Sequence, residues 1–175
     1  MSTTRPPDCI SLADHRDGDR RVEHWVRWAF VVALVVLVAA GLLNVFGQRE
    51  VTTSATGRAA TLEVTAPGAL RGGLIFQGRF RLRSEGAITR PTLALEGGWL
   101  DGITLNTVQP EPKTSTGEDG GVVFTFDRLA PGRSLTVYLE LQVNPTTTGR
   151  RSQGVELRDG DRTLARVERS ITIFP

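Results

Sequence analysis

The sequence predicts an all-β protein, an antiparallel β-sandwich preceded by one transmembrane α-helix. Two observations lead to this prediction. Residues 28–46 form an apolar run without a charged side chain, and from Thr61 onward apolar and polar residues alternate. Short clusters of Gly, Pro, Asp and Ser interrupt the alternation, as turns between short strands do. A chain of 175 residues has room for one such domain and one accessory segment.

Residues 28–46, WAFVVALVVLVAAGLLNVF, predict a helix that spans a membrane. As a helix they rise about 28 Å, which matches the hydrocarbon core of a bilayer, and they leave no polar stripe to face water. The alternative is a cleaved signal peptide, for which residues 38–40 could supply a processing site. The apolar run continues past that site and 27 residues precede it, so we favour a retained span.

The residues on either side of this run predict its orientation. Four arginines precede it and two follow it: Arg16, Arg20, Arg21 and Arg27, then Arg49 and Arg58. Because arginine-rich flanks stay in the cytoplasm, residues 1–27 are predicted to be a cytoplasmic tail, mostly disordered until near Asp19. Trp25, Arg27 and Trp28 are predicted anchors at the membrane interface. The prediction is a single-pass plasma-membrane protein with its C-terminal domain outside.

The rest of the chain divides into a connecting stalk and the sandwich. Residues 47–57 are polar and lack periodicity, which predicts a stalk, and residues 58–175 predict the extracytoplasmic sandwich. The clearest alternation runs from Leu135 to Val143, where every second residue is apolar. About seven to nine short strands without a helical pattern predict two antiparallel sheets packed face to face. Residues 109–121, rich in Pro, Gly and polar residues, are predicted to be a mobile loop.

Two segments resemble strands of a known family: LAPGRSLTVYLEL at residues 129–141 and FQGRFRLRSEG at residues 76–86. In the first, a Leu-x-Pro-Gly-x-Ser turn leads into a long alternating strand. Through these two segments, residues 60–175 resemble bacterial immunoglobulin-like surface domains. The resemblance implies an immunoglobulin-like sandwich but no particular activity. The whole chain is similar to short single-span membrane proteins of GC-rich bacteria. Lys113, the only lysine among 21 basic residues, fits such a genome.

Composition and residue types argue against several functions. The formal net charge of +2 is small, which argues against nucleic-acid binding. Beyond residue 47 the chain has neither His nor Cys. This excludes Ser-His catalysis, Cys-His catalysis and the common zinc sites from that part of the chain. We expect no enzyme, no cofactor, no metal and no small-molecule substrate. Glu156, Asp159 and Asp161 could hold calcium, but their spacing favours a hairpin turn.

Arg79, Arg81 and Arg83 form the first candidate interaction site. The alternation places all three on one solvent-facing side of a strand, about 6.6 Å apart. The favoured interpretation is a charged outer face that only discourages edge pairing and aggregation. The row can also bind lipid headgroups, acidic envelope polymers or an acidic protein partner.

The segment EGGWLDG, residues 96–102, holds the second candidate site. Its glycines place Trp99 outside a regular strand. Trp99 then either closes the end of the sandwich as a core residue or, beside Asp101, forms an exposed interaction hot spot. The core interpretation is the favoured one.

Three functions fit these observations. The favoured one is a non-enzymatic, membrane-anchored interaction module, an accessory subunit of a membrane or envelope protein. Its partners would be the lipid bilayer and a protein in the membrane or envelope. The second is a binder of acidic envelope polymers or lipid headgroups through the basic strand face. The third is a short signal transducer, whose small tail would need a further partner to act.

Overall fold

The computed structural model of the chain describes residues 17–42, 48–57 and 59–175, with side chains from Glu23 onward. It has two compact units, Met1–Phe46 and Gly47–Pro175. The first unit contains one helix, and the second contains the strands. Each unit is described by itself.

The helix α1 (Asp17–Leu42) begins earlier than the apolar run that predicts it. It begins close to Asp19, where the predicted disorder of the tail ends, and residues 17–27 are helical because no Gly or Pro follows Gly18 to interrupt the run into the apolar segment. Among residues 23–42 every side chain is exposed except that of Ala40, which is half-buried. Glu23–Leu42 is long and apolar enough to cross a membrane, by length and composition. Residues 43–46 of the predicted span lie outside the described residues.

The second unit is built of strands, which confirms the predicted fold class. Thirteen strands are present in the described residues: β1 (Glu50–Thr56), β2 (Ala60–Pro67), β3 (Ala69–Arg71), β4 (Ile75–Ser84), β5 (Pro91–Leu95), β6 (Ile103–Gln109), β7 (Thr114–Glu118), β8 (Gly121–Thr125), β9 (Ser134–Val143), β10 (Gly149–Ser152), β11 (Val155–Asp159), β12 (Arg162–Val167) and β13 (Ser170–Phe174). One short 3-10 helix, Gly97–Trp99, follows β5.

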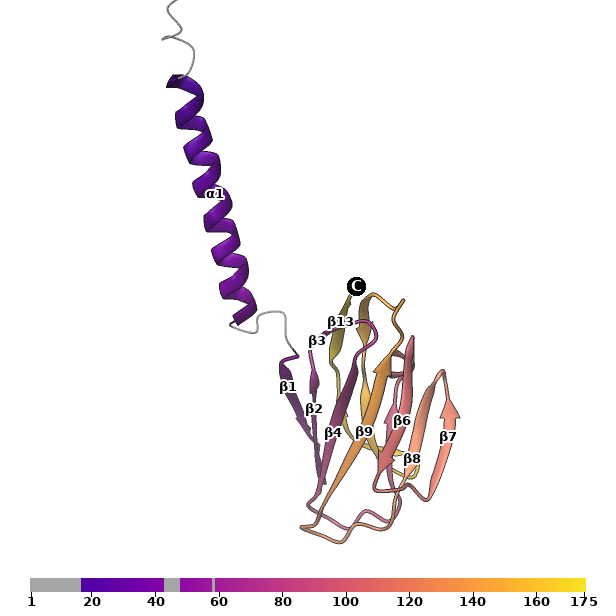
Figure 1. Ribbon diagram of the computed structural model, residues 1–175. Helices are drawn as coiled ribbons and strands as arrows, with labels where there is room; N and C mark the ends of the chain where they lie inside the picture. The colour runs from indigo at the N-terminus through magenta and orange to yellow at the C-terminus, as the bar shows by residue number, and fades with distance from the viewer. Residues whose placement is uncertain (1–16, 43–47, 58) are drawn as a thin grey trace, which may run out of the picture. The chain divides into compact units, whose positions relative to one another are not determined.

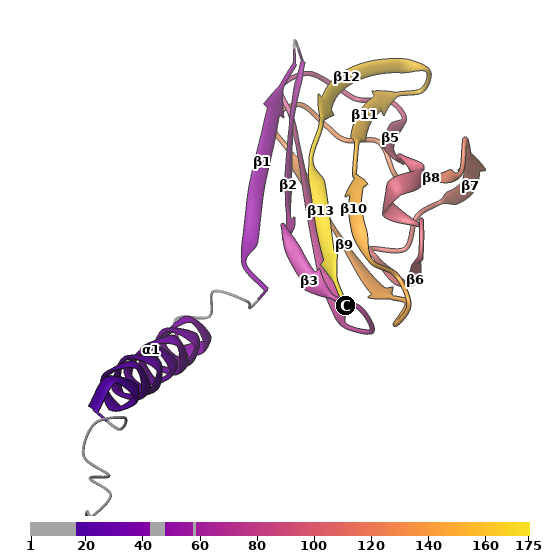
Figure 2. The same cartoon turned by 90° about the horizontal axis from the view of Figure 1, so that it is seen from above.

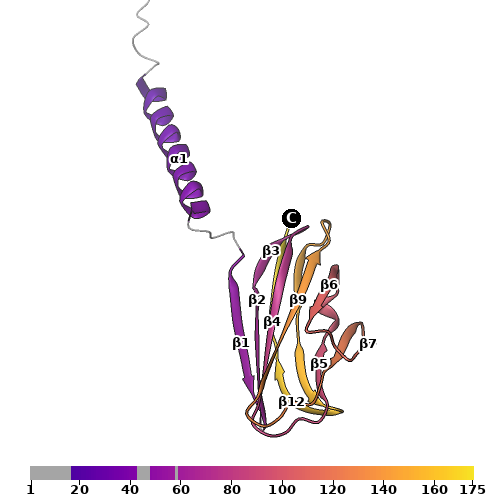
Figure 3. The same ribbon diagram turned by 60° about the horizontal axis from the view of Figure 1, so that its bottom comes forward.

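The strands form three hydrogen-bonded sheets. The β4 sheet has the order β1-β2-β4-β9-β6, and its strands lie side by side in Figure 1. The β11 sheet has the order β12-β11-β5-β8-β7, and the β13 sheet has the order β10-β13-β3. All neighbouring strands are antiparallel except β13 and β3, which are parallel. Figure 3 shows the β4 sheet as one layer of the sandwich, with strands of the other two sheets in the second layer.

The alternation of side chains along the strands produces the core between the layers. In β4 and β9 every second residue points inward and is buried, as in Phe80, Leu82, Leu139 and Leu141. The facing layer contributes the buried apolar side chains Leu93, Phe124, Leu157 and Ile171. Because side chains on a strand alternate between its two faces, the same pattern leaves the polar residues of β4 and β9 on the outside.

Two parts of the predicted organisation are wrong. The predicted stalk, residues 47–57, contains strand β1, which pairs with β2 from Glu50 opposite Pro67 to Thr56 opposite Thr61. Its Thr, Ser and Ala side chains carry little hydrophobic alternation, so backbone pairing along the sheet edge decides its structure. The predicted loop, residues 109–121, contains strand β7, whose residues are all exposed and which pairs with β8.

The two ends of the sandwich are formed by different segments. Figure 2 shows that the start of β1, the strand β3 and the C-terminal end of β13 lie at one end. The start of β12 and the end of β1 lie at the other. Strand β4 runs between these ends, so the residues before Ile75 and those after Ser84 are separated by the length of the sandwich.

Candidate interaction surface

The three arginines of the basic row lie where alternation predicts. Arg79, Arg81 and Arg83 are exposed on the outer face of β4, whereas Phe80 and Leu82 between them are completely buried. The inner side chains pack in the core and hold the strand in register, so the outer positions are fixed relative to one another. The row is therefore part of a rigid sheet surface.

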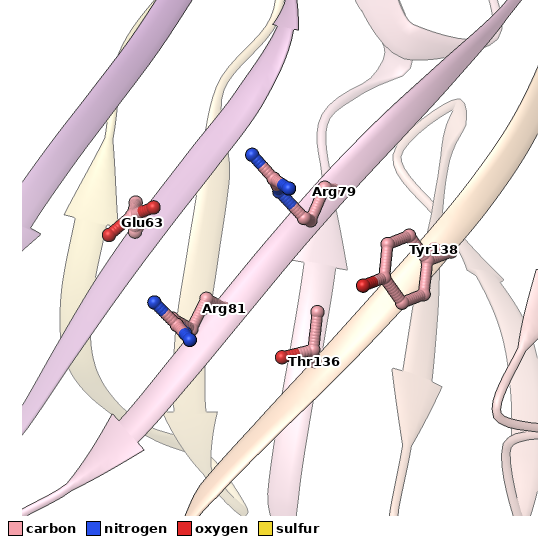
Figure 4. A pocket seen from close by; sticks show the side chains of 5 residues that line it. All are labelled: Glu63, Arg79, Arg81, Thr136 and Tyr138. Atoms are coloured by element: carbon pink, nitrogen blue, oxygen red, sulfur yellow. The ribbon is translucent and has the colours of Figure 1, made fainter.

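Pairing with the neighbouring strands gives the row its surroundings. Arg81 lies opposite Glu63 of β2 and Thr136 of β9, and Arg79 lies opposite Tyr138 of β9. These five residues line one shallow pocket on the sheet surface. In Figure 4 the two guanidinium groups lie on the side of β4 that faces Glu63, and the Tyr138 hydroxyl points toward β4 from the other side. The surface thus combines positive charge, one carboxylate and one aromatic ring.

The basic row has no ion pair of its own in the part of the chain that the structure describes. No carboxylate oxygen of the described residues lies within 4.0 Å of a guanidinium nitrogen of Arg79, Arg81 or Arg83. Glu63, although it faces Arg81 across the strands, is not close enough to pair. The charge of these three arginines is consequently available to a partner.

The outer face of the β11 sheet differs, because its arginines are paired with carboxylates of the chain itself. Glu156 accepts from Arg158 at 2.8 Å and from Arg166 at 2.7 Å. Arg158 also reaches Glu118 at 3.1 Å, and Arg166 reaches Glu96 at 2.7 Å. These contacts join β7, β11 and β12. The two outer faces of the sandwich therefore differ in their arginines. On the β11 sheet the arginines are paired with carboxylates of the chain, whereas on the β4 sheet the arginines of the basic row are not paired with any carboxylate of the described residues.

The paired carboxylate Glu156 makes the stability of the sandwich depend on pH. Burial raises the pKa of Glu156, but the hydrogen bonds and charges of Arg158 and Arg166 outweigh this effect and hold the pKa below its ordinary value of 4.5. A lowered pKa in the folded state means that ionised Glu156 stabilises the fold above pH 4.5. This contribution is lost as the pH falls from 4.5 through the folded pKa.

We expect Glu156→Gln to lower the free energy of unfolding at pH 7 by about 1–3 kcal/mol, because charged hydrogen bonds become neutral ones. Unfolding with urea as a function of pH measures this. The substitution should also flatten the loss of stability below pH 4.5. Glu140→Gln, on the exposed outer face of β9, is the matched control and should change little. If the free energy of unfolding of the unsubstituted chain and of Glu156→Gln changed with pH in the same way, the proposed contribution of Glu156 to stability would be contradicted.

In the EGGWLDG segment the structure supports the interpretation of Trp99 as a core residue over that of an exposed hot spot. Trp99 is 0% exposed, so it cannot meet a partner as an exposed hot spot. Its indole nitrogen donates to the Gly154 carbonyl at 3.1 Å, and its ring lies 5.2 Å from that of Phe80. Asp101 remains on the surface and pairs with Arg151 at 2.6 Å. The structure therefore separates Trp99 and Asp101 and brings neither to the basic row.

Sequence reasoning missed Arg169, which packs against Trp99. The Arg169 guanidinium lies 5.4 Å from the centre of the Trp99 ring and donates to the carbonyls of Ala66 and Pro67 at 3.0 and 2.6 Å. Burial lowers the pKa of Arg169 to about 10. No pattern in the sequence marks this arginine as half-buried, because an arginine in the short connection between two strands is normally a surface residue. Its contacts join the β13 sheet to the end of β2.

The acidic turn forms the predicted hairpin. Asp159 and Asp161 flank Gly160, whose φ of 59° suits a tight turn between β11 and β12. One Asp159 oxygen accepts from the backbone nitrogen of Arg90 at 2.7 Å. Among the described residues no group of three or more His, Cys, Asp or Glu side chains is arranged to hold a metal ion.

The fold has counterparts among solved structures. The CARDB domain of a Pyrococcus furiosus protein is 9% identical, with a TM-score of 0.45 over 67% of this chain and 94% of that one. A non-cellulosomal cohesin from Archaeoglobus fulgidus is 14% identical, with a TM-score of 0.42 over 63% and 88%. The CaCohA2 structure from Clostridium acetobutylicum is 14% identical, with a TM-score of 0.44 over 67% and 92%.

No protein-family model matches the chain, and no curated protein sequence matches it.

Proposed function

We propose that the protein is a non-enzymatic, membrane-anchored interaction module, an accessory subunit of a membrane or envelope protein. In this proposal the apolar part of α1 holds the chain in the plasma membrane with residues 1–27 in the cytoplasm, and the sandwich presents its β4 sheet to a protein partner outside. The observation that carries the proposal is the row of Arg79, Arg81 and Arg83, which is exposed and has no ion pair among the described residues.

The chemistry of this surface fits an acidic protein partner. Arginine and tyrosine are enriched at protein interfaces because they combine a large contact area with directed hydrogen bonds. A guanidinium group binds a carboxylate through two parallel hydrogen bonds, and the partner would supply carboxylates close enough to pair with the row, which Glu63 and Glu140 are not. Tyr138 is 38% exposed beside the row and offers an aromatic contact.

The unpaired row also favours, as a second candidate, binding of acidic envelope polymers or lipid headgroups. Glu63 and Glu140 lie on the same outer face as the arginines. A uniformly anionic polymer would be repelled by both carboxylates, whereas a protein can place a cation or a hydrogen-bond donor opposite each of them. This mixed charge favours a protein partner over a polymer.

We expect the double substitution Arg79→Glu and Arg81→Glu to weaken binding of the partner about 10- to 100-fold, because each reversal places like charges together. A photo-crosslinking amino acid at Tyr138, in the full chain in membranes, should give one discrete protein adduct that the double variant loses. Arg128→Glu, in the exposed segment between β8 and β9, is the matched control and should keep the adduct. An adduct that survives the double substitution would refute the role of the row.

The orientation is tested separately by cysteine labelling. Cys9 is the only cysteine, so a membrane-impermeant maleimide added to sealed spheroplasts should leave the protein unlabelled until the membrane is opened. Thr116→Cys in a Cys9→Ser background places a thiol in the exposed strand β7 and should label at once. The reverse pattern would overturn the orientation.

A further inference from the structure

The exposed apolar side chains of the sandwich are concentrated at one end. In the described part of the second unit, five large apolar side chains are exposed: Val51, Leu74, Ile75, Tyr138 and Phe174. Tyr138 lies opposite Arg79 on the outer face of the β4 sheet, four residues along β4 from Ile75, which lies on the same face. The other four, each between 40% and 54% exposed, lie in the segments that form the end where β1 begins and β13 finishes (Figure 2).

Contacts between the segments that carry these four residues, here called the apolar end, bring those segments to the same end of the sandwich. The Gly72 nitrogen donates to the Phe174 carbonyl at 2.9 Å, and Leu74 and Ile75 follow directly along the chain. A methyl group added at Gly68 would lie 3.0 Å from a Val51 methyl, so Val51 packs beside Gly68. The Gly68 carbonyl in turn accepts from Thr172, two residues before Phe174, at 3.0 Å.

The covalent chain ties this end to the apolar helix. Helix α1 ends at Leu42 and β1 begins at Glu50, so residues 43–49 are the whole connection. Even fully extended, such a segment reaches at most about 25 Å. A helix held in a bilayer therefore keeps the apolar end within reach of the lipid surface, while the opposite end can lie farther away by the length of the ten-residue strand β4.

The charges at this end suit the same surface. Arg71, the last residue of β3, is exposed three residues before Leu74, and its side chain donates to the Pro175 carbonyl at 3.1 Å. A cation beside exposed apolar side chains is the combination found in segments that lie at the membrane interface. Arginine there meets anionic headgroups while the apolar groups enter the acyl boundary.

We infer that the apolar end of the sandwich inserts Val51, Leu74, Ile75 and Phe174 into the headgroup region of the bilayer that holds α1. The inference rests on the proposed membrane anchorage and adds a second lipid contact to it. Four half-exposed side chains bind lipid only weakly on their own. The short connection raises the effective concentration of lipid to the order of millimolar or above, which makes a weak contact sufficient. The domain would then stand on the membrane with the basic row directed along its side.

Site-directed spin labels on the full chain test this contact. In a Cys9→Ser background, single cysteines at Leu34, Leu74, Ala130 and Pro175 are labelled, and the protein is reconstituted into phosphatidylcholine vesicles containing phosphatidylglycerol. Collision rates with oxygen, which concentrates in lipid, and with a water-soluble nickel chelate are compared. Labels at 74 and 175 should show an oxygen-to-nickel ratio several-fold above that at Ala130, which is exposed near the opposite end.

The label at Leu34, in the middle of α1, separates the possible failures. A lipid-like ratio at 34 with water-like ratios at 74 and 175 would overturn this inference and leave the anchorage intact. A water-like ratio at 34 would overturn the anchorage and this inference with it. Labels at 74 and 175 shielded from both reagents would mean that a second copy of the chain or another protein covers the apolar end, which also overturns the lipid contact.

A pair of variants then tests the apolar side chains themselves. The double substitution Ile75→Gln and Phe174→Gln should return the label at 175 to a water-like ratio. Both side chains are half-exposed, so the fold should survive, and thermal unfolding checks this. Tyr138→Gln removes an exposed ring opposite Arg79, four residues along β4 from Ile75, and should leave the ratio at 175 unchanged. If the double variant also leaves it unchanged, the apolar end does not make the contact.

Discussion

Replacing Trp99 with alanine is expected to lower the free energy of unfolding of the sandwich by about 3–5 kcal/mol. The side chain is 0% exposed, so its removal leaves a large cavity beside Phe80. The same change leaves the Gly154 carbonyl without its indole donor and uncovers the guanidinium of Arg169. A typical domain has only about 5–15 kcal/mol of stability, so the loss is a large fraction of the total.

Urea unfolding of the full chain in detergent, followed by the far-ultraviolet circular dichroism of the strands, measures this loss. Tyr138→Ala is the matched control, because it removes an exposed ring and should change stability by about 0.5 kcal/mol or less. Trp99→Phe keeps a ring beside Phe80 and should lower the free energy of unfolding less than Trp99→Ala does. A Trp99→Ala variant as stable as the Tyr138→Ala variant would show that the indole does not hold the core together.

Gly98→Ala is expected to destabilise the sandwich by about 1–3 kcal/mol or more, although it adds only one methyl group. A methyl carbon at this position would lie 1.7 Å from the Ser152 carbonyl oxygen, which belongs to the backbone of β10 and cannot rotate away. The turn that holds Trp99 would have to move off the strand. Thermal unfolding of the Gly98→Ala variant is compared with that of Gly86→Ala, where the added methyl group has no neighbour within 4 Å. Equal melting temperatures for the two variants would contradict the close approach of Gly98 to the Ser152 carbonyl.

The strands with two distinct faces could be predicted from the sequence. In β9 the apolar residues Leu135 to Val143 alternate with polar ones because one side packs in the core and the other meets water. The same physics in β4 places Arg79, Arg81 and Arg83 on one face. Strands β1 and β7 could not be predicted in this way, because they lie at sheet edges and carry few apolar side chains to reveal their pairing.

The surroundings of the basic row depend on pairing between distant parts of the chain. Glu63 and Tyr138 come to Arg79 and Arg81 only through the register of β2 and β9 with β4, which no local pattern specifies. Arg169 escaped prediction for a similar reason. Its burial comes from the carbonyls of Ala66 and Pro67, about a hundred residues away in the sequence.

The parallel pairing of β13 with β3 sets the order in which the domain can be completed. β3 (Ala69–Arg71) is made early in synthesis, and its only hydrogen-bonded neighbour in the sheets, β13 (Ser170–Phe174), is made about a hundred residues later. Contacts between such distant residues form slowly, because a long loop must close first. Strand β3 therefore stays without its partner in the sheet until β13 has been synthesised, and the β13 sheet is the last of the three that can be completed.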